Sequence, residues 1–331
     1  MSGIVIRLSL TCWNYDRVQP LLDGRVTIAG VELDCHVQYP TQTFARAFSE
    51  APADISELSA SSYVMQVARG QCAYVALPAF VSRAFRHGGF YVRTDAGIAS
   101  PKDLEGKRVG VPEYQMTMAL WARGLLADDF GVDPDTLRYR TGGTNEPGRK
   151  ERLALKLPAH MDVAPIAEDK TLNELLVSGE LDAVIAPSPP SAFTDGDHTV
   201  ARLFDDPKAA ERDYYRRTGI FPIMHMIGIR RSLADAHPGL ALAVYEAFCE
   251  ARRIAMDELQ ATATASANRI HLPWLATEWE ETRALMGGDF WPYGVSANSA
   301  DLDALCRYSL AQHLAPKEIR PERLFHPDTL D

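Results

Sequence analysis

The sequence has no long hydrophobic run and little positive charge. Its apolar stretches are short and broken by charged residues, well below the roughly 20 residues that span a bilayer. With 34 Lys and Arg against 44 Asp and Glu, the net charge is −10, so long-range electrostatics would repel nucleic acid and anionic lipid. We therefore expect neither a nucleic-acid nor a membrane partner, and any positive charge that binds a ligand must be local.

Cysteine is also scarce. The five cysteines are odd in number and widely spaced, without a Cys-x-x-Cys pair or a zinc-finger spacing to histidine. The segment Met1–Trp13 reads as a strand and lacks the basic start and apolar block of a secretory leader. These features predict free thiols and a cytoplasmic protein. A catalytic Cys12 is the less favoured alternative to a small buried core residue.

Standard cofactor and metal motifs are missing too. The sequence has no Gly-x-Gly-x-x-Gly, P-loop or Gly-x-Ser-x-Gly elbow, and no His-x-x-x-His or His-Glu-x-x-His. We predict no organic cofactor and no metal. The alternative is a divalent metal held by residues assembled across the fold, namely Asp16, His87, Glu113 and His225.

Alternating strand-like and helical patterns predict an α/β fold, in which mostly parallel sheets are covered by helices. The expected strands are Ile4–Leu10, Val31–Val37, Tyr74–Leu77, Lys107–Val111, Leu137–Arg140 and Leu181–Ala186. The expected helices are Thr43–Phe48, Ser62–Ala68, Met116–Phe130, Thr171–Ser178 and a long helix with an apolar stripe from Leu240 to Ala255.

The length of 331 residues predicts two domains, because a single core usually splits beyond roughly 250–300 residues. We expect one discontinuous lobe from residues 1–100 and 221–331, which includes a helical C-terminal tail, and a second lobe from residues 101–220. The chain would cross between the lobes near residues 92–105 and 200–222. Ligands of open α/β sheets bind beyond the carboxyl ends of the strands, here in the cleft between the lobes.

Two polar clusters in the predicted first lobe are expected at this cleft. The first, Trp13-Asn14-Tyr15-Asp16-Arg17, follows the first strand, and its alternative reading is a helix cap with a surface ion pair. The second spans Ser82–His87 and contains Arg83 and Arg86. Two guanidinium groups and an imidazole so close together predict a local anion site, with an exposed basic turn as the alternative.

Two further clusters lie elsewhere. Glu113-Tyr114-Gln115 joins an expected strand to its helix, where free N–H groups and the helix dipole would favour a bound carboxylate, although Glu113 could simply complement that dipole. The loop Gly142–Arg149 is a weaker anion signal at the cleft rim. His225 stands among apolar residues at the second crossing, where the alternative is a hydrogen-bonded core histidine.

Several segments of the sequence resemble one known family in order along the chain. The specific ones are SRAFRHGGFYVR at Ser82–Arg93, GVPEYQMT at Gly110–Thr117 and TGIFPIMH at Thr218–His225, supported by CWNYDR at Cys12–Arg17 and ADISELSASSY at Ala53–Tyr63. Through them the chain resembles the 4,5-dihydroxyphthalate decarboxylase family, which implies a two-lobed type 2 periplasmic-binding-protein-like fold. The chain departs from the family pattern at Asn14, where Asp is usual.

The resemblance implies decarboxylation of a hydroxylated aromatic acid such as 4,5-dihydroxyphthalate to a dihydroxybenzoate and carbon dioxide. The alternative is a cytoplasmic non-catalytic binding protein or sensor for an aromatic acid, and a homo-oligomer is compatible with the sequence. We expect an anion clamp, a ring acid and a phenol base, and histidine suits the acid because its ordinary pKa is near neutrality. We expect Arg83 and Arg86 to form the clamp, and Trp13 and Tyr114 to stack on the ring. The expected acid is His225 or His87, and the expected base is Glu113 or Asp16. The other expected substrate-binding residues are Asn14, Tyr15, Arg17, Ser61, Ser82, Gln115 and Arg149.

Overall fold

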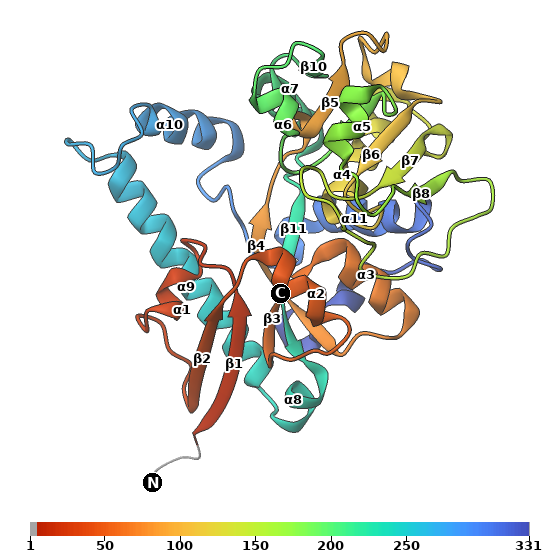
Figure 1. Ribbon diagram of the computed structural model, residues 1–331. Coiled ribbons are helices and arrows are strands. Elements are labelled where there is room, and N and C mark those ends of the chain that lie inside the picture. The colour runs from red at the N-terminus through yellow and green to blue at the C-terminus, as the bar shows by residue number, and fades with distance from the viewer. Residues whose placement is uncertain (1–4, 331) are drawn as a thin grey trace.

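Two β-sheets flanked by helices form the protein, shown in Figure 1 as a computed structural model that describes residues 5–330. Sheet A has the order β2-β1-β3-β11-β4, and sheet B has the order β10-β5-β9-β6-β7-β8. The strands of sheet A are β1 Ile6–Cys12, β2 Val31–Val37, β3 Ile55–Ser59, β4 Tyr74–Arg83 and β11 Ile223–Arg230. Those of sheet B are β5 Phe90–Arg93, β6 Arg108–Val111, β7 Arg138–Thr141, β8 Val163–Pro165, β9 Ala183–Ile185 and β10 Val200–Arg202. The prediction of an α/β fold with two mixed, mostly parallel sheets is confirmed.

Each sheet contains one strand that runs against the others. In sheet A, β11 is antiparallel to both of its neighbours, β3 and β4. In sheet B, β5 is antiparallel to β9 and β10, while β6, β7 and β8 pair in parallel. The parallel arrangement brings the carboxyl ends of β1 and β3 to the same edge of sheet A. Of the predicted first strand, Ile4 lies outside the described residues.

Helices cover both sheets. They are α1 Gln19–Leu22, α2 Pro40–Ala47, α3 Ala60–Arg69, α4 Thr117–Phe130, α5 Leu172–Ser178, α6 Ser191–Thr194, α7 Pro207–Thr218, α8 Arg231–Ala236, α9 Leu240–Ala263, α10 Leu275–Met286 and α11 Ser299–Ala311. Helix α4 ends at Gly131 as predicted, because its φ of 61° lies in the left-handed region that glycine adopts without strain. Among the described helices, none is long and apolar enough to cross a membrane.

The chain passes from sheet A to sheet B between the end of β4 and the start of β5, at residues 84–89. This is earlier than the predicted 92–105, because β5 already pairs with β9 and β10 of sheet B. The return to sheet A runs from the end of α7 to the start of β11. We call the two halves the sheet A lobe and the sheet B lobe.

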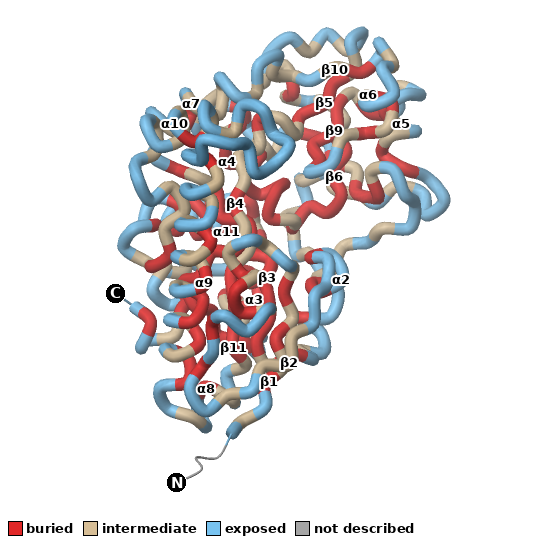
Figure 2. The backbone as a smooth tube through the Cα atoms, turned by 90° about the vertical axis from the view of Figure 1, so that its left-hand side faces the viewer, coloured by how far each residue is buried: buried red, intermediate tan, exposed pale blue. Residues whose placement is uncertain are grey.

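The C-terminal tail is helical, as its sequence pattern predicts, but it contacts more than the sheet A lobe. Helix α9 packs on α1 and β4, whereas α11 contacts both α3 and α4. Buried residues run through the centre of both lobes (Figure 2) and join into one large apolar cluster that includes residues of α4, β4, β11 and α11. The tail therefore helps to hold the two lobes together at the base of the cleft.

Candidate active site

A cavity of about 240 Å³ lies between the two lobes. Trp13, Phe44 and His225 line it from the sheet A lobe, and Arg149 and Arg152 line it from the sheet B lobe. Ligand pockets typically have volumes of roughly 300–1,000 Å³, so this one suits a small ligand with a single ring.

Aromatic rings form the wall of the cleft on the side of β1. Trp13, directly after β1, packs its ring at 4.4 Å from that of Tyr39. Phe44 of α2 meets the His225 imidazole edge-on, with ring centroids 4.7 Å apart. These inclined rings offer an apolar wall against which an aromatic ligand could pack.

The most unusual group beside the cleft is a buried carboxylate. Glu57 of β3 is 0% exposed, and its Oε1 lies 2.7 Å from His225 Nδ1 and accepts a hydrogen bond of 2.8 Å from the Tyr15 hydroxyl. Its Oε2 accepts from the Trp13 backbone N–H at 3.1 Å and faces the Cys12 thiol at 3.6 Å. Because Nδ1 donates to Glu57, Nε2 is left for the cleft that His225 lines.

The partners of Glu57 keep it ionised. Burial by itself would raise its pKa, but the hydrogen bond and charge of His225, together with the Tyr15 hydroxyl and the Trp13 N–H, outweigh burial and lower the pKa. Burial and the adjacent Glu57 charge raise the pKa of the Tyr15 hydroxyl and of the Cys12 thiol, so both stay protonated. The arrangement is an oriented imidazole backed by a fixed negative charge.

A second carboxylate holds two guanidinium groups at the opposite wall. Glu113, buried after β6, accepts from Arg149 Nε and Nη2 at 3.0 and 2.6 Å and from Arg152 Nη2 at 3.1 Å, all on its Oε1. One carboxylate thus neutralises only one of two adjacent positive charges. The remaining charge faces a cleft that both arginines line.

Arg86 supplies a third guanidinium to the cleft. Among the described residues it forms no ion pair, and its Nε donates a hydrogen bond to Met224 Sδ at 3.2 Å. Burial lowers its pKa to about 10, which still leaves it charged at neutral pH. No carboxylate of the described residues lies within ion-pair distance of Arg86, although the charge of Glu211 acts on it from farther away, and Arg86 lines the same cavity.

Hydrogen bonds close the two lobes on each other beside the cleft. The hydroxyls of Ser59 and Thr117 lie 2.9 Å apart, and the Ser61 N–H donates to Thr117 Oγ1 at 3.1 Å. Ser62 Oγ donates to Gln115 Oε1 at 2.9 Å. The start of α3 is thereby fastened to the start of α4.

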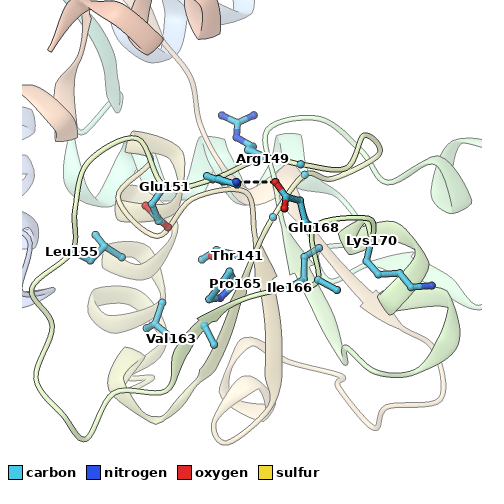
Figure 3. Close-up of a pocket in the computed structure, with 15 residues that line it drawn as sticks. Thr141, Arg149, Glu151, Leu155, Val163, Pro165, Ile166, Glu168 and Lys170 are labelled. Carbon is cyan, nitrogen blue, oxygen red and sulfur yellow. Dashed lines mark ion pairs between the residues drawn. The ribbon is translucent and has the colours of Figure 1, made fainter. Parts of the chain in front are cut away.

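A larger cavity of about 470 Å³ lies within the sheet B lobe, next to the segment from Gly142 to Glu151 (Figure 3). The ends of β7 and β8 line it, with Glu151 on one side and Lys170 on the other. Arg149 belongs to the walls of both cavities. The interlobe cleft, unlike this cavity, combines an aromatic wall with an oriented imidazole and several cations.

Comparisons with known proteins show the family of the chain. Residues 15–186 match the family described as the phosphonate ABC transporter periplasmic substrate-binding protein. A 4,5-dihydroxyphthalate decarboxylase from Comamonas testosteroni is 42% identical over 326 residues, which are 98% of this chain and 98% of the relative. The chain belongs to the 4,5-dihydroxyphthalate decarboxylase family.

Two further comparisons support the relationship and the fold. A 4,5-dihydroxyphthalate decarboxylase from Pseudomonas putida is 48% identical over 211 residues, covering 64% of this chain and 82% of the relative. The solved alkanesulfonate-binding protein from Xanthomonas axonopodis pv. citri superposes with a TM-score of 0.51 at 14% identity, covering 98% of this chain and 99% of that one. This likeness confirms the predicted periplasmic-binding-protein-like fold.

Part of the site predicted for this member of the decarboxylase family lies at the cleft. The predicted residues that line the cleft are Trp13, Tyr15, Ser82, Arg86, Arg149 and His225. Arg17 lies behind them, with its guanidinium 4.5 Å from the Tyr15 ring centroid and 4.1 Å from that of Trp291. Asn14, where the family usually has Asp, is exposed and does not line the cavity.

Other predicted roles do not fit the structure. Arg83 is buried away from the cleft, where it donates to the Phe221 and Pro292 carbonyls and pairs with Asp301 at 3.6 Å, so it is not the anion clamp. Asp16 is exposed and pairs with Arg17, which takes it out of reach as a base.

The sheet B lobe gives similar corrections. Glu113 is committed to its two arginines and is not free to act as the phenol base. Tyr114 is buried beneath Arg123, at 3.8 Å from its ring centroid, and so does not stack on a ligand. Gln115, like Ser61 of the sheet A lobe, belongs to the seam between the lobes.

His87 is a core residue. Only 2% exposed, it packs edge-on against Phe204 and Tyr214, and its Nδ1 has no hydrogen-bond partner in the described structure. The four residues considered as a metal site, Asp16, His87, Glu113 and His225, do not form a metal-ligand group within residues 5–330.

Several residues of the site were not predicted, among them Phe44, Ser59 and Thr117, and two others carry charge. Glu57 is the single charged residue of Ile55–Ser59, a segment with too few apolar residues to read as a strand. An acidic residue between small and apolar neighbours, inside a motif typical of the family, was the available signal. Arg152 falls in a stretch without a regular pattern, and its role follows only from its contact with Glu113.

We predict that replacing His87 by Leu removes a source of acid instability. Burial lowers the pKa of His87 to about 4 from its usual value near 6.5, so the unfolded chain takes up this proton first as the pH falls. The stability from neutral His87 is present above pH 6.5 and is lost towards pH 4. Between pH 7 and pH 5 the free energy of unfolding of the wild type should fall by about 1–2 kcal/mol more than that of His87→Leu.

Urea unfolding at the two pH values measures this difference. His198→Leu is the matched control, because His198 is exposed and its loss should leave the pH dependence as in the wild type. An unchanged pH dependence in His87→Leu would contradict the assignment of His87 to the core.

Proposed function

We propose that the protein decarboxylates a hydroxylated aromatic dicarboxylic acid, with 4,5-dihydroxyphthalate as the first candidate. The products would be 3,4-dihydroxybenzoate and carbon dioxide. The named relatives support the reaction. The observation that carries the proposal is a cleft in which the oriented His225 imidazole shares its cavity with Arg86, Arg149 and Arg152.

The charge of the cleft suits a dianion. Three guanidinium groups line it and Glu113 pairs with two of them, while burial raises the pKa of the nearby Glu151 and Glu211 and so limits their negative charge, which leaves an excess of positive charge. The Glu57 and His225 pair is neutral when the imidazole is protonated. A phthalate-type ligand carries one negative charge on each of two adjacent carboxylates, and guanidinium groups bind carboxylates through paired hydrogen bonds.

The proposed reaction replaces a carboxylate by a proton at a ring carbon. A hydroxyl para to the leaving carboxylate releases electron density into the ring, and the protonated His225 donates the proton from Nε2 to the carbon that bears this carboxylate. The carbon–carbon bond then breaks, its electron pair restores the aromatic ring, and carbon dioxide leaves. One proton is consumed in each turnover, and His225 regains it from solvent.

Glu57 would hold the imidazole in place and stabilise its charged form, as a buried carboxylate does behind a catalytic histidine. The hydroxyls of Ser59, Ser82 and Thr117 also line the cleft and can accept a hydrogen bond from a phenol. The cations would hold the carboxylate that remains, and the ring of Trp13 would lie along the substrate.

Incubation of the purified protein with 4,5-dihydroxyphthalate tests the proposal directly. We expect equal amounts of carbon dioxide and 3,4-dihydroxybenzoate, measured by trapped gas and by chromatography. His225→Gln should lower kcat by about 10² or more, since it removes the ring acid. Binding of phthalate, an analogue without hydroxyls, should persist in this variant. Wild-type protein that binds both acids without turnover would identify a binding protein or sensor instead.

A second prediction concerns Glu57. Glu57→Gln keeps the size of the side chain but removes the charge that stabilises the imidazolium, so kcat should fall by about 10² while the KM for substrate changes little. Tyr15→Phe is the matched control, because it removes one hydrogen bond to Glu57 and leaves the charge. Steady-state kinetics of both variants measure the effect. If kcat fell by the same small factor in Glu57→Gln and in Tyr15→Phe, the result would contradict the role of Glu57.

A third prediction concerns selectivity for two carboxylates. Arg152→Met should weaken phthalate binding by about 10-fold or more and benzoate binding much less, because only the diacid needs the second cation. Calorimetric titration of both acids measures this. Arg152→Lys should recover part of the affinity, and Arg253→Met, at an exposed position of α9, should change neither. Equal losses for both acids would argue against a two-cation site.

A further inference from the structure

Three potential metal ligands from distant parts of the chain converge outside the cleft. Asp135 lies in the short helix Pro134–Thr136, His160 lies in the segment between β7 and β8, and His313 follows α11. One ligand atom of each lies within 4.8 Å of those of the other two. None of the three lines the interlobe cavity.

The distances match those between the ligands of a metal ion. His160 Nε2 lies 3.3 Å and His313 Nε2 lies 3.2 Å from the same oxygen, Asp135 Oδ2. Ion-paired hydrogen bonds are usually shorter, at about 2.7–2.9 Å. Two ligand atoms bound tetrahedrally at about 2.0–2.1 Å are about 3.3 Å apart, which matches both distances to Asp135, and the two imidazole nitrogens lie within 4.8 Å of each other.

One of the three ligands, His313, stands on a rigid support. Gln312, next to His313, is tied to α4 by buried hydrogen bonds with Arg123 and with the Leu120 carbonyl. The backbone of His313 adopts a φ of 61°, which is uncommon for a residue other than glycine, and its side chain still meets Asp135. Ligands whose positions are fixed before binding lose little conformational freedom when a metal arrives.

We propose that Asp135, His160 and His313 bind one divalent transition-metal ion, with Zn²⁺ as the best fit. Two imidazole nitrogens and one carboxylate oxygen are a ligand set that zinc accepts, and water would complete the tetrahedron. The His160 side chain is 61% exposed and the His313 side chain 33%, so solvent reaches the site.

A metal ion at this site would affect the cleft, because the segment that contains His160 also contributes residues to the cleft. This segment, residues 142–162 between β7 and β8, also contains Arg149 and Arg152 of the cleft. Asp135 and His313 lie shortly after the ends of α4 and α11, two helices that pack on each other. A bound metal ion would fasten the segment to these two helices, and so hold the arginines of the cleft indirectly.

Titration of the metal-stripped, full-length protein with ZnCl₂ tests the site. We expect one equivalent to bind, with a rise in Tm of about 3–5 °C at a free Zn²⁺ concentration 100-fold above Kd. Co²⁺ in place of Zn²⁺ should give the intense visible absorption of a tetrahedral site. The readouts are calorimetry, thermal unfolding and absorption, and none depends on catalytic activity.

Two variants and a control decide whether these residues are the ligands. His160→Ala and His313→Gly should each weaken Zn²⁺ binding at least 30-fold, and His313→Gly should keep or raise the Tm of the metal-free protein because glycine suits the positive φ. His198→Ala, at an exposed histidine outside the group, should bind as the wild type does. Failure of the wild type to bind one equivalent, or binding that survives both ligand variants, would overturn the proposal.

Discussion

The structure of the site depends on one buried charge. A carboxylate removed from water costs several kcal/mol unless hydrogen bonds and an opposite charge compensate for it, and Glu57 is fully buried in the middle of sheet A. Its compensation comes from the Trp13 N–H, the Tyr15 hydroxyl and His225 Nδ1. These groups stand at the end of β1 and on β11, strands that lie on either side of β3. Satisfying one charge therefore fixes the order of three strands, the direction of the imidazole and the start of the aromatic wall.

The positive charge of the cleft also depends on how individual charged side chains are paired. The chain as a whole is acidic, with a net charge of −10, so a dianion gains nothing from the distant field. Salt screens exposed charges beyond about 8–10 Å, which leaves binding to contacts inside the cleft. Glu113 keeps Arg149 and Arg152 adjacent although they repel each other, and Arg86 is balanced only by the more distant charge of Glu211. Local pairing, not composition, sets the sign of the potential that a ligand meets.

The sequence predicted the fold and a minority of the residues that line the cleft, because both rest on local patterns. The rule that ligands lie beyond the carboxyl ends of strands places Trp13 and Tyr15 at the cleft, and the position of His225 at the second crossing places it there too. The rule could not say which of two neighbouring arginines faces the ligand. Alternation along β4 points Ser82 into the cleft and Arg83 away from it, towards Asp301. Glu57 escaped notice because β3 is buried at all five positions, where a carboxylate is acceptable only through partners that are distant in sequence.

The division of the site between the lobes explains how a binding-protein fold could serve an enzyme. Binding an organic anion requires only cations and an apolar wall, and the sheet B lobe supplies Arg149 and Arg152 for this. Proton transfer to a ring carbon requires in addition an acid held within reach of the bound anion, and His225 comes from sheet A. The two requirements meet only where hydrogen bonds such as that between Ser59 and Thr117 bring the lobes together. An anion held by the sheet B lobe alone would be bound but would not react. The reaction would begin only when the lobes close and bring His225 to the bound anion.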